Sequence, residues 1–429
     1  MTGSATDAPK GPTDTPKDAR DKDALSLVYR LTARPWMAGL FAFVFLFPIL
    51  GNVISRLTRK HGWWLNDYDA LICGAHSVGL GQSPYSLNPV CEGLRPAPFV
   101  YAPQVGAVFA PLVNGLGFAG ARWVYLIPLL PALCVLVWFA LGKVLPKAPF
   151  WLRLMTFAAI NGSVFACGNI GLVLHAIVIA AALNLNRTRI PFVAAVILGA
   201  LVKPVFLTYL IVLLMQDRPM GLRLRDFTIS AALGLGAVAW LMLDAGPFGA
   251  AWHAVLNAIV IQQQPGIGLF SYTSLIGFPA ASPVALILYL PFAAVIAISG
   301  LVVAEWSGFD AGERVVLGLG VAQLLNPRLM DYDLFVLTPA VVLIVMQAKA
   351  FGPRAFAWAT WAFAGVLVFA VVINSVAGPH INDLIKRAPI AVFVYCGLLV
   401  FVAWRTAQRH AAEIRALVKD PKALFAKAA

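Results

Sequence analysis

The sequence predicts an all-α polytopic membrane protein, and three observations lead to that prediction. Of the 429 residues, 60% are hydrophobic and 12% are charged, whereas an ordinary soluble domain is about a quarter charged. The mean hydropathy is +0.82. Apolar runs that reach or approach the roughly 20 residues needed to cross a bilayer recur along the chain. Water is therefore not the main solvent of this protein.

Two classes of apolar run make up the membrane part. The longer runs, read as spans, are 36–55, 121–142, 226–244, 283–304, 332–348, 355–375 and 389–404. The shorter runs are 104–118, 150–166, 170–185, 190–202, 204–216 and 314–325. The shorter runs have the length of tilted spans, halves of broken helices or re-entrant segments. We expect roughly 11 to 13 spans or membrane-embedded helices in total.

The two ends of the chain differ in composition from its middle. Residues 1–35 are rich in Lys, Asp, Thr and Pro and lack an apolar signal-peptide core, which predicts a disordered cytoplasmic tail. The run 36–55 is then a retained anchor. We expect one membrane domain over 36–405, with a long extracytoplasmic loop at 57–103, and a basic cytoplasmic tail over 406–429.

The distribution of charge predicts the orientation. The formal charge is +13, but Lys and Arg are scattered over short connections and both ends, which argues against nucleic acid as a partner. With basic connections and the N-terminus in the cytoplasm, residues 57–103, 246–281, 326–333 and 376–388 lie together on the opposite face. This parity requires the run 104–118 to be re-entrant, since otherwise the basic linker 143–153 lies on the wrong side, and the sequence leaves the parity of this region open.

The loop 57–103 is far longer than connections usually are, which indicates a function. Trp63 and Trp64 fit an interfacial aromatic belt and set the following carboxylates near the lipid headgroups. Asp67 and Asp69 are two residues apart, so they point in different directions, and we expect one to be a catalyst or ligand. Asp67 also fits a helix N-cap, and both interpretations stay open.

Lys203-Pro204 interrupts an apolar stretch that runs from about 190 to 216. A lysine at the bilayer centre costs about 2.5–3.5 kcal/mol on insertion scales and usually faces a cavity or a partner. If Pro204 breaks the stretch into two helices, Lys203 stands at a helix end. There the ammonium binds a phosphate or snorkels to the interface, and the residues alone leave both open.

A polar segment at 326–333 separates two apolar runs on the predicted outer face. Arg328 and Asp331 are three residues apart and would form an ion pair on one helical face. A guanidinium is also the preferred bidentate partner of a phosphate. Structural and functional interpretations are therefore both open here.

Weaker signals come from Gly168-Asn169-Ile170-Gly171, a break between apolar runs, and from the outer loop 262–272. The histidines show no metal-binding spacing, so we predict no zinc or other metal site and expect no cofactor. Cys73 and Cys91 share the polar loop and would pair if the loop faces an oxidising compartment; the sequence leaves this open.

The order of these motifs resembles the family 87 membrane glycosyltransferases of the GT-C type, which include mycobacterial polyprenyl-phosphate-mannose-dependent mannosyltransferases. The resemblance covers about residues 36–348. It rests on an Asp-aromatic pair, Gly-x-x-Pro-Tyr, Tyr-x-Pro, a Gly-Asn break, Lys-Pro and a late polar motif. Here these are Asp67-Tyr68, Gly81 to Tyr85, Tyr101-Ala102-Pro103, Gly168-Asn169, Lys203-Pro204 and Asn326 to Asp333.

The resemblance implies transfer of a sugar, with inversion, from a polyprenyl-phosphate donor to a lipid or glycan acceptor. This reaction would take place at the outer face of a bacterial inner membrane. Asp67 would be the catalytic base, while Lys203 and Arg328 would stabilise the departing phosphate. Further substrate-binding candidates are Tyr68, Asp69, Tyr85, Tyr101, Asn169, Asp331 and Tyr332.

Members of that family commonly place histidine and tryptophan in the late motif, where this chain has Met330-Asp331-Tyr332. Mannose is therefore only the default donor sugar. The rival interpretation is a transporter or flippase of a lipid-linked sugar, which also places charges at helix breaks. A non-catalytic scaffold would leave Lys203 and the long loop unexplained.

Overall fold

The computed structural model describes residues 65–142, 144–161, 167–377 and 387–420, with the single positions 46, 50 and 54. The predicted tail 1–35, most of the run 36–55, and the pair Trp63 and Trp64 lie outside the described residues. The described residues are helical or irregular, and none of them belongs to a β-strand.

The first half of the described chain begins with α3 (Asn66–Gly79), α4 (Pro103–Leu141), α5 (Phe150–Ile160) and α6 (Ile170–Ala182). It continues with α7 (Ile190–Val202), η2 (Pro204–Met215), α8 (Met220–Leu243), η3 (Gly246–Phe248), α9 (Gly249–Val255) and η4 (Leu256–Gln263). The second half contains α10 (Leu269–Leu275), α11 (Pro283–Trp306), α12 (Ala311–Leu324), η5 (Asp331–Val336) and α13 (Leu337–Ala348). It ends with η6 (Lys349–Phe351), α14 (Pro353–Ala377), α15 (Arg387–Arg409) and α16 (Ala411–Lys419).

Length and composition identify the membrane spans among these helices. Five are long and apolar enough to cross a bilayer, namely 103–141, 220–243, 283–306, 331–351 and 388–409. Five shorter apolar helices are 150–160, 170–182, 190–202, 204–215 and 353–369. The prediction of an all-α polytopic membrane protein is therefore confirmed. The predicted number of segments also counted 36–55, which the structure does not describe as a whole.

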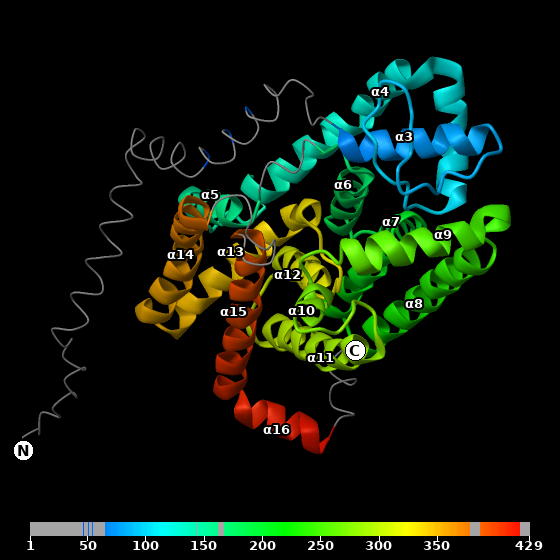
Figure 1. Ribbon diagram of the computed structural model, residues 1–429. Coiled ribbons are helices and arrows are strands. Elements are labelled where there is room, and N and C mark those ends of the chain that lie inside the picture. The colour runs from blue at the N-terminus through cyan, green and yellow to red at the C-terminus, as the bar shows by residue number, and fades with distance from the viewer. Residues whose placement is uncertain are drawn as a thin grey trace, which may run out of the picture.

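Helix α4 consists of two limbs. Gly117 breaks it with φ 65° and ψ 177°, a conformation that glycine adopts without steric cost. Figure 1 shows the limbs meeting at a sharp angle beside α3. The limb before Gly117 is about 21 Å long, too short to cross about 30 Å of hydrocarbon. It packs against α3, where Val78 lies beside Gly106.

The core of the protein is formed by α12, α13 and η2. Every residue from Arg314 to Leu324 is buried, as are nearly all residues of α13. Small residues let these helices approach closely, since a Cβ on Gly318 would lie 3.1 Å from the Cα of Val212. Gly320 faces Ala340 in the same way. The remaining helices surround this centre (Figure 1).

The outer surfaces of the surrounding helices are apolar. Large hydrophobic side chains exposed on α4, α8, α11 and α14 include Trp123, Ile127, Leu233, Trp240, Ile287, Leu290, Trp358 and Trp361. A soluble monomer rarely exposes apolar patches on this scale, whereas lipid covers them in a membrane protein. These surfaces agree with insertion in a bilayer.

Segments predicted to share one face of the membrane do contact one another. Gln104 Nε2 donates to the carbonyl of Asp244 (2.7 Å), and Trp252 Nε1 donates to the carbonyl of Val100 (3.1 Å). The Ile267 amide donates to the carbonyl of Leu329 (2.7 Å). The loop 57–103 therefore meets the segment after α8, and the segment before α10 meets residues 326–329. This end of the protein is called the loop face below.

Candidate functional site

Four predicted site residues from distant parts of the chain form one connected group at the loop face. Asn169 Nδ2 donates to Asp67 Oδ2 (2.6 Å), and Lys203 Nζ donates to Asn169 Oδ1 (2.5 Å). Lys203 Nζ also lies 4.1 Å from the centre of the Tyr332 ring, within cation–π range. We call Asp67, Asn169, Lys203 and Tyr332 the polar cluster.

Asp67 lies in the first turn of α3 and is half-buried. The N-cap position belongs to Leu65, so the interpretation of Asp67 as an N-cap is wrong. Its carboxylate accepts one bond from Asn169 and one from Asn66 Nδ2 (2.8 Å). A carboxylate has about four acceptor positions, so capacity remains for a substrate hydroxyl.

Asn169 is held by the start of α6. It is the N-cap of that helix, and its Oδ1 accepts from the amide of Gly171 (2.8 Å) as well as from Lys203. A Cβ on Gly171 would lie 2.8 Å from Lys203 Nζ, so glycine leaves room for the ammonium. Gly168 has φ +65° and packs against Leu65. The Gly-Asn break thus places an amide between a carboxylate and an ammonium.

Lys203 lies between α7 and η2, as we predicted from the helix break at Pro204. Helix α7 ends at Val202, Lys203 is extended (φ −141°, ψ 103°), and Pro204 opens η2. The side chain is half-buried, and Asp333, Asp67 and Arg328 are close enough to interact with it electrostatically. The ammonium is therefore directed into the polar cluster.

Two hydrogen bonds hold Arg328 beside the polar cluster. Its amide donates to Asn326 Oδ1 (3.0 Å), and its Nε donates to the carbonyl of Gln264 (3.1 Å). Both Lys203 and Tyr332 lie in its electrostatic range. Among the described contacts of Arg328, none uses the two terminal nitrogens of the guanidinium, so they are available to an anion.

Two tyrosines of the Gly-x-x-Pro-Tyr and Tyr-x-Pro motifs contact each other. Tyr85 hydroxyl donates to the carbonyl of Tyr101 (2.8 Å), and both rings pack on Phe99. Tyr101 is buried, and its hydroxyl interacts electrostatically with Asp67. Burial, and then the nearby Asp67 carboxylate, raise the pKa of Tyr101, which keeps the phenol neutral. Tyr85 supports the backbone that leads into α4.

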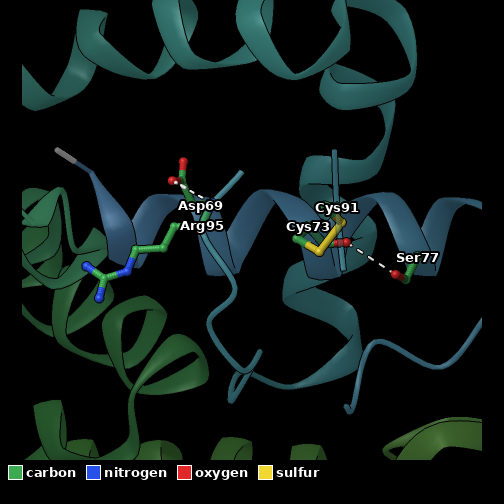
Figure 2. The surroundings of a disulfide bond; sticks show 5 residues. All are labelled: Asp69, Cys73, Ser77, Cys91 and Arg95. Carbon is green, nitrogen blue, oxygen red and sulfur yellow. Dashed lines mark hydrogen bonds between the residues drawn. A yellow bond between two sulfur atoms is a disulfide. The ribbon is translucent and has the colours of Figure 1, made fainter. Parts of the chain in front are cut away.

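Asp69 points away from the polar cluster, as the spacing of the two carboxylates predicted. It is buried, forms an ion pair with Arg122 of α4, and accepts from the Arg95 amide (3.3 Å). Four residues further along α3, Cys73 is bonded to Cys91. Figure 2 shows the hydrogen bond between Asp69 and Arg95 and the disulfide of Cys73 and Cys91 beside α3. Asp69 and the disulfide hold residues 91–95 against α3, which is a structural role.

Tyr68 and Asp331 are two further candidates. The ring of Tyr68 is fully buried and stacks on Tyr125 at 4.3 Å between centroids. Asp331 is exposed at the start of η5. Residues 326–330 are not helical, with a turn at Pro327 and Arg328, so the helical face that Arg328 and Asp331 would share does not exist.

A buried network behind Lys203 was not predicted as part of the site. His175 Nε2 lies 2.7 Å from Asp333 Oδ1, and His175 Nδ1 lies 2.7 Å from the hydroxyl of Tyr209. Gln323 Nε2 donates to the same hydroxyl (2.5 Å). Both ring nitrogens of His175, on the apolar helix α6, therefore take part in buried hydrogen bonds. Asp333 was named only as the end of a motif, and no sequence signal linked it to a residue 158 positions away.

In the described ranges no three His, Cys, Asp or Glu side chains gather as they would around a metal ion. The chemistry of the cluster is that of a carboxylate with spare acceptor capacity, joined through an amide to an ammonium, with a guanidinium close by. Such a set can take a proton from a hydroxyl and stabilise an anion a few ångströms away.

Searches of protein-family models, of curated proteins and of solved structures found no match to this chain.

Proposed function

We propose that this protein is an integral membrane glycosyltransferase. Its donor is a sugar linked to a polyprenyl phosphate, with mannose as the default hexose, and its acceptor is a lipid or glycan hydroxyl. The observation that carries the proposal is the polar cluster, in which Asp67 and Lys203 share the side chain of Asn169. A base and a cation held together suit a reaction that needs one proton acceptor and releases one phosphate.

Asp67 is the base of this reaction. The acceptor hydroxyl gives its proton to the Asp67 carboxylate while its oxygen forms a bond to the anomeric carbon of the donor sugar. The bond from that carbon to the phosphate oxygen breaks, and its electron pair leaves with the polyprenyl phosphate. A single displacement of this kind inverts the anomeric centre and needs no second carboxylate as an acid, unlike glycoside hydrolysis.

Lys203 and Arg328 receive the leaving phosphate. Negative charge grows on the phosphate as the bond breaks, and preorganised cations stabilise it most at that moment. Arg328 has its terminal nitrogens directed to no described partner, and Lys203 has two ammonium protons beyond its bond to Asn169. The Tyr332 ring beside Lys203 offers a face for a sugar.

The location of the site supports a lipid-linked donor in the outer leaflet. The disulfide of Cys73 and Cys91 is anchored on α3, four residues beyond Asp69 and six beyond Asp67. Disulfides persist in oxidising compartments such as a periplasm or cell exterior. The disulfide therefore supports the proposal that the loop face lies on the extracytoplasmic side of the inner membrane, where the donor would be a polyprenyl-phosphate sugar instead of a nucleotide sugar.

The test is transfer from a panel of short-chain polyprenyl-phosphate sugars by the purified protein, with endogenous lipid extract as acceptor. The expected result is a glycosylated product formed together with free polyprenyl phosphate, and no product from the matching nucleotide sugars. If no donor of the panel gives product, the same protein in sealed vesicles is tested for moving those donors across the bilayer. Movement without transfer would replace the proposal by a transporter.

A further inference from the structure

A second polar group lies at the other end of α8 from the loop face. Asp244, at the C-terminal end of α8, accepts from Gln104 at the loop face. The opposite end begins at Met220, so about 36 Å of helix separates the two ends. Figure 1 shows α8 running from beside α11 up to beside α9. This distance spans the hydrocarbon of a bilayer, and the start of α8 therefore reaches the opposite interface.

Three arginines from different elements meet there around one carboxylate. Arg189 precedes α7 and Arg218 precedes α8, and both form ion pairs with Asp226 of α8; the Arg218 Nη1 to Oδ2 distance is 2.9 Å. Arg225 Nη2 lies 3.4 Å from the other oxygen of Asp226. We call these four residues the arginine triad site. Three positive charges against one negative charge leave the site with a net charge of about +2.

The excess charge is available to a partner. The side chains of Arg189, Arg218 and Arg225 are 35%, 30% and 58% exposed, whereas that of Asp226 is 12% exposed. Each guanidinium has five N–H donors, and the contacts described above use one nitrogen of each. Burial lowers the pKa of Arg218, and the neighbouring Arg189 and Arg225 lower it further, so these charges repel one another. An additional anion would relieve this repulsion.

Apolar side chains begin directly beneath the arginines. On α8, Ile229 and Leu233 are 54% and 59% exposed, and on α7, Ile190 is 78% exposed. Leu233 lies seven residues after Asp226, which places it on the same side of the helix and about 10 Å deeper in the membrane. A free phosphate has no apolar part that could cover this surface. A phospholipid covers it with its acyl chains while its headgroup meets the guanidinium groups.

We propose that the arginine triad site binds the phosphodiester headgroup of an anionic glycerophospholipid of the cytoplasmic leaflet. Basic pockets between membrane helices on the cytoplasmic side bind such headgroups, and guanidinium groups match their oxygens in bidentate geometry. The lipid contacts the starts of both α7 and α8. Its phosphate neutralises part of the positive charge of Arg189, Arg218 and Arg225 that Asp226 leaves unbalanced. This inference stands apart from the proposed transfer reaction, because it uses none of the residues of the polar cluster.

The test is native mass spectrometry of delipidated protein in detergent, titrated separately with phosphatidylglycerol and with phosphatidylcholine. Wild type is expected to bind phosphatidylglycerol in preference. Each basic residue near a membrane surface contributes about fivefold, so Arg189→Gln with Arg218→Gln is expected to weaken that binding about 30-fold. Arg415→Gln, on the exposed face of α16, removes a charge elsewhere and is expected to change it less than twofold.

Asp226→Asn gives an independent check, because it removes the anion that competes with the lipid. It is expected to strengthen binding of phosphatidylglycerol severalfold, whereas a purely structural ion-pair cluster would lose stability without gaining affinity. If the double variant is not monodisperse, Arg225→Gln is compared in its place. Equal binding of the two lipids by wild type, unchanged binding in the arginine variants, or displacement of the lipid by 10-fold excess inorganic phosphate would each overturn the proposal.

Discussion

Breaking the disulfide of Cys73 and Cys91 tests how the segment beside the polar cluster is held in place. The bond closes a loop of 18 residues between α3 and the segment that carries Arg95. Replacing both cysteines by serine keeps the size of the side chains and removes the cross-link. The described contacts that also hold this segment include the bond from the Arg95 amide to Asp69 of α3 and the bond from the Leu94 amide to the carbonyl of Cys91 (3.1 Å).

The size of the effect follows from the loop length. In the chain-entropy model the cross-link removes about 2.1 + 1.5R ln n cal/mol/K from the open state, and with n = 18 this is about 11 cal/mol/K. At 25 °C the open state is then disfavoured by about 3 kcal/mol. Because each 1.4 kcal/mol is a factor of ten, losing the bond is expected to populate local opening of residues 80–98 up to about 200-fold more.

Hydrogen exchange of peptides from this segment measures the change directly. Amides of residues 80–98 are expected to exchange about 100-fold faster in the Cys73→Ser, Cys91→Ser variant, while those of α12 and α13 in the core keep their rates. Cys134→Ser, which removes a free cysteine of α4, is the control. Exchange within threefold of wild type would refute the reasoning, since Asp69 and the local hydrogen bonds would then suffice to hold the segment.

Three further substitutions probe the site and its support. Gly168→Ala places a Cβ on a backbone with φ +65° and against Leu65, so the free energy of unfolding is expected to fall by about 1–3 kcal/mol. Thermal unfolding measures this loss, and an unchanged midpoint temperature would contradict the expectation. Lys203→Met keeps the stem and removes the charge; sugar transfer is expected to fall about 10²–10³-fold with the fold intact, and transfer above half of wild type would exclude the proposed role. His175→Leu leaves the buried Asp333 carboxylate without its His175 partner and is expected to lower the free energy of unfolding by about 3–5 kcal/mol. Adding Asp333→Asn in the same chain is expected to recover a large part of this loss. Equal loss in the single and double variants would show that the contact between His175 and Asp333 is not the cause.

The helices were largely predictable because hydrocarbon demands long apolar runs. The predicted run 190–202 has the same limits as α7, and the break at Pro204 follows from the missing amide proton and fixed φ of proline. The interruption of α4 at Gly117 was expected only as a consequence of charge parity. Helix α3 was treated as loop, because its small residues, among them Gly74 and Ala75, gave no apolar run of membrane length.

The site was predictable in its members and not in its connections. Asp67, Asn169 and Lys203 were singled out by position, but which of them touch depends on how α3, α6 and α7 pack. Asp69 was correctly expected to diverge from Asp67, since that depends on local geometry alone. Its partner Arg122 lies 53 residues away, and no spacing rule relates the two.

In the proposed reaction, Asp67 takes the proton of the acceptor hydroxyl. The most direct measurement compares the initial rate of sugar transfer from polyprenyl phosphate by wild type, by Asp67→Asn and by Asp244→Asn. Asp244 has an exposed side chain near the loop face, so its substitution makes the same chemical change outside the cluster. Asp67→Asn is expected to lose about 10²–10⁴-fold in rate, while Asp244→Asn is expected to stay within twofold of wild type. Transfer by Asp67→Asn at the wild-type rate would contradict this role of Asp67 and assign the base to another group.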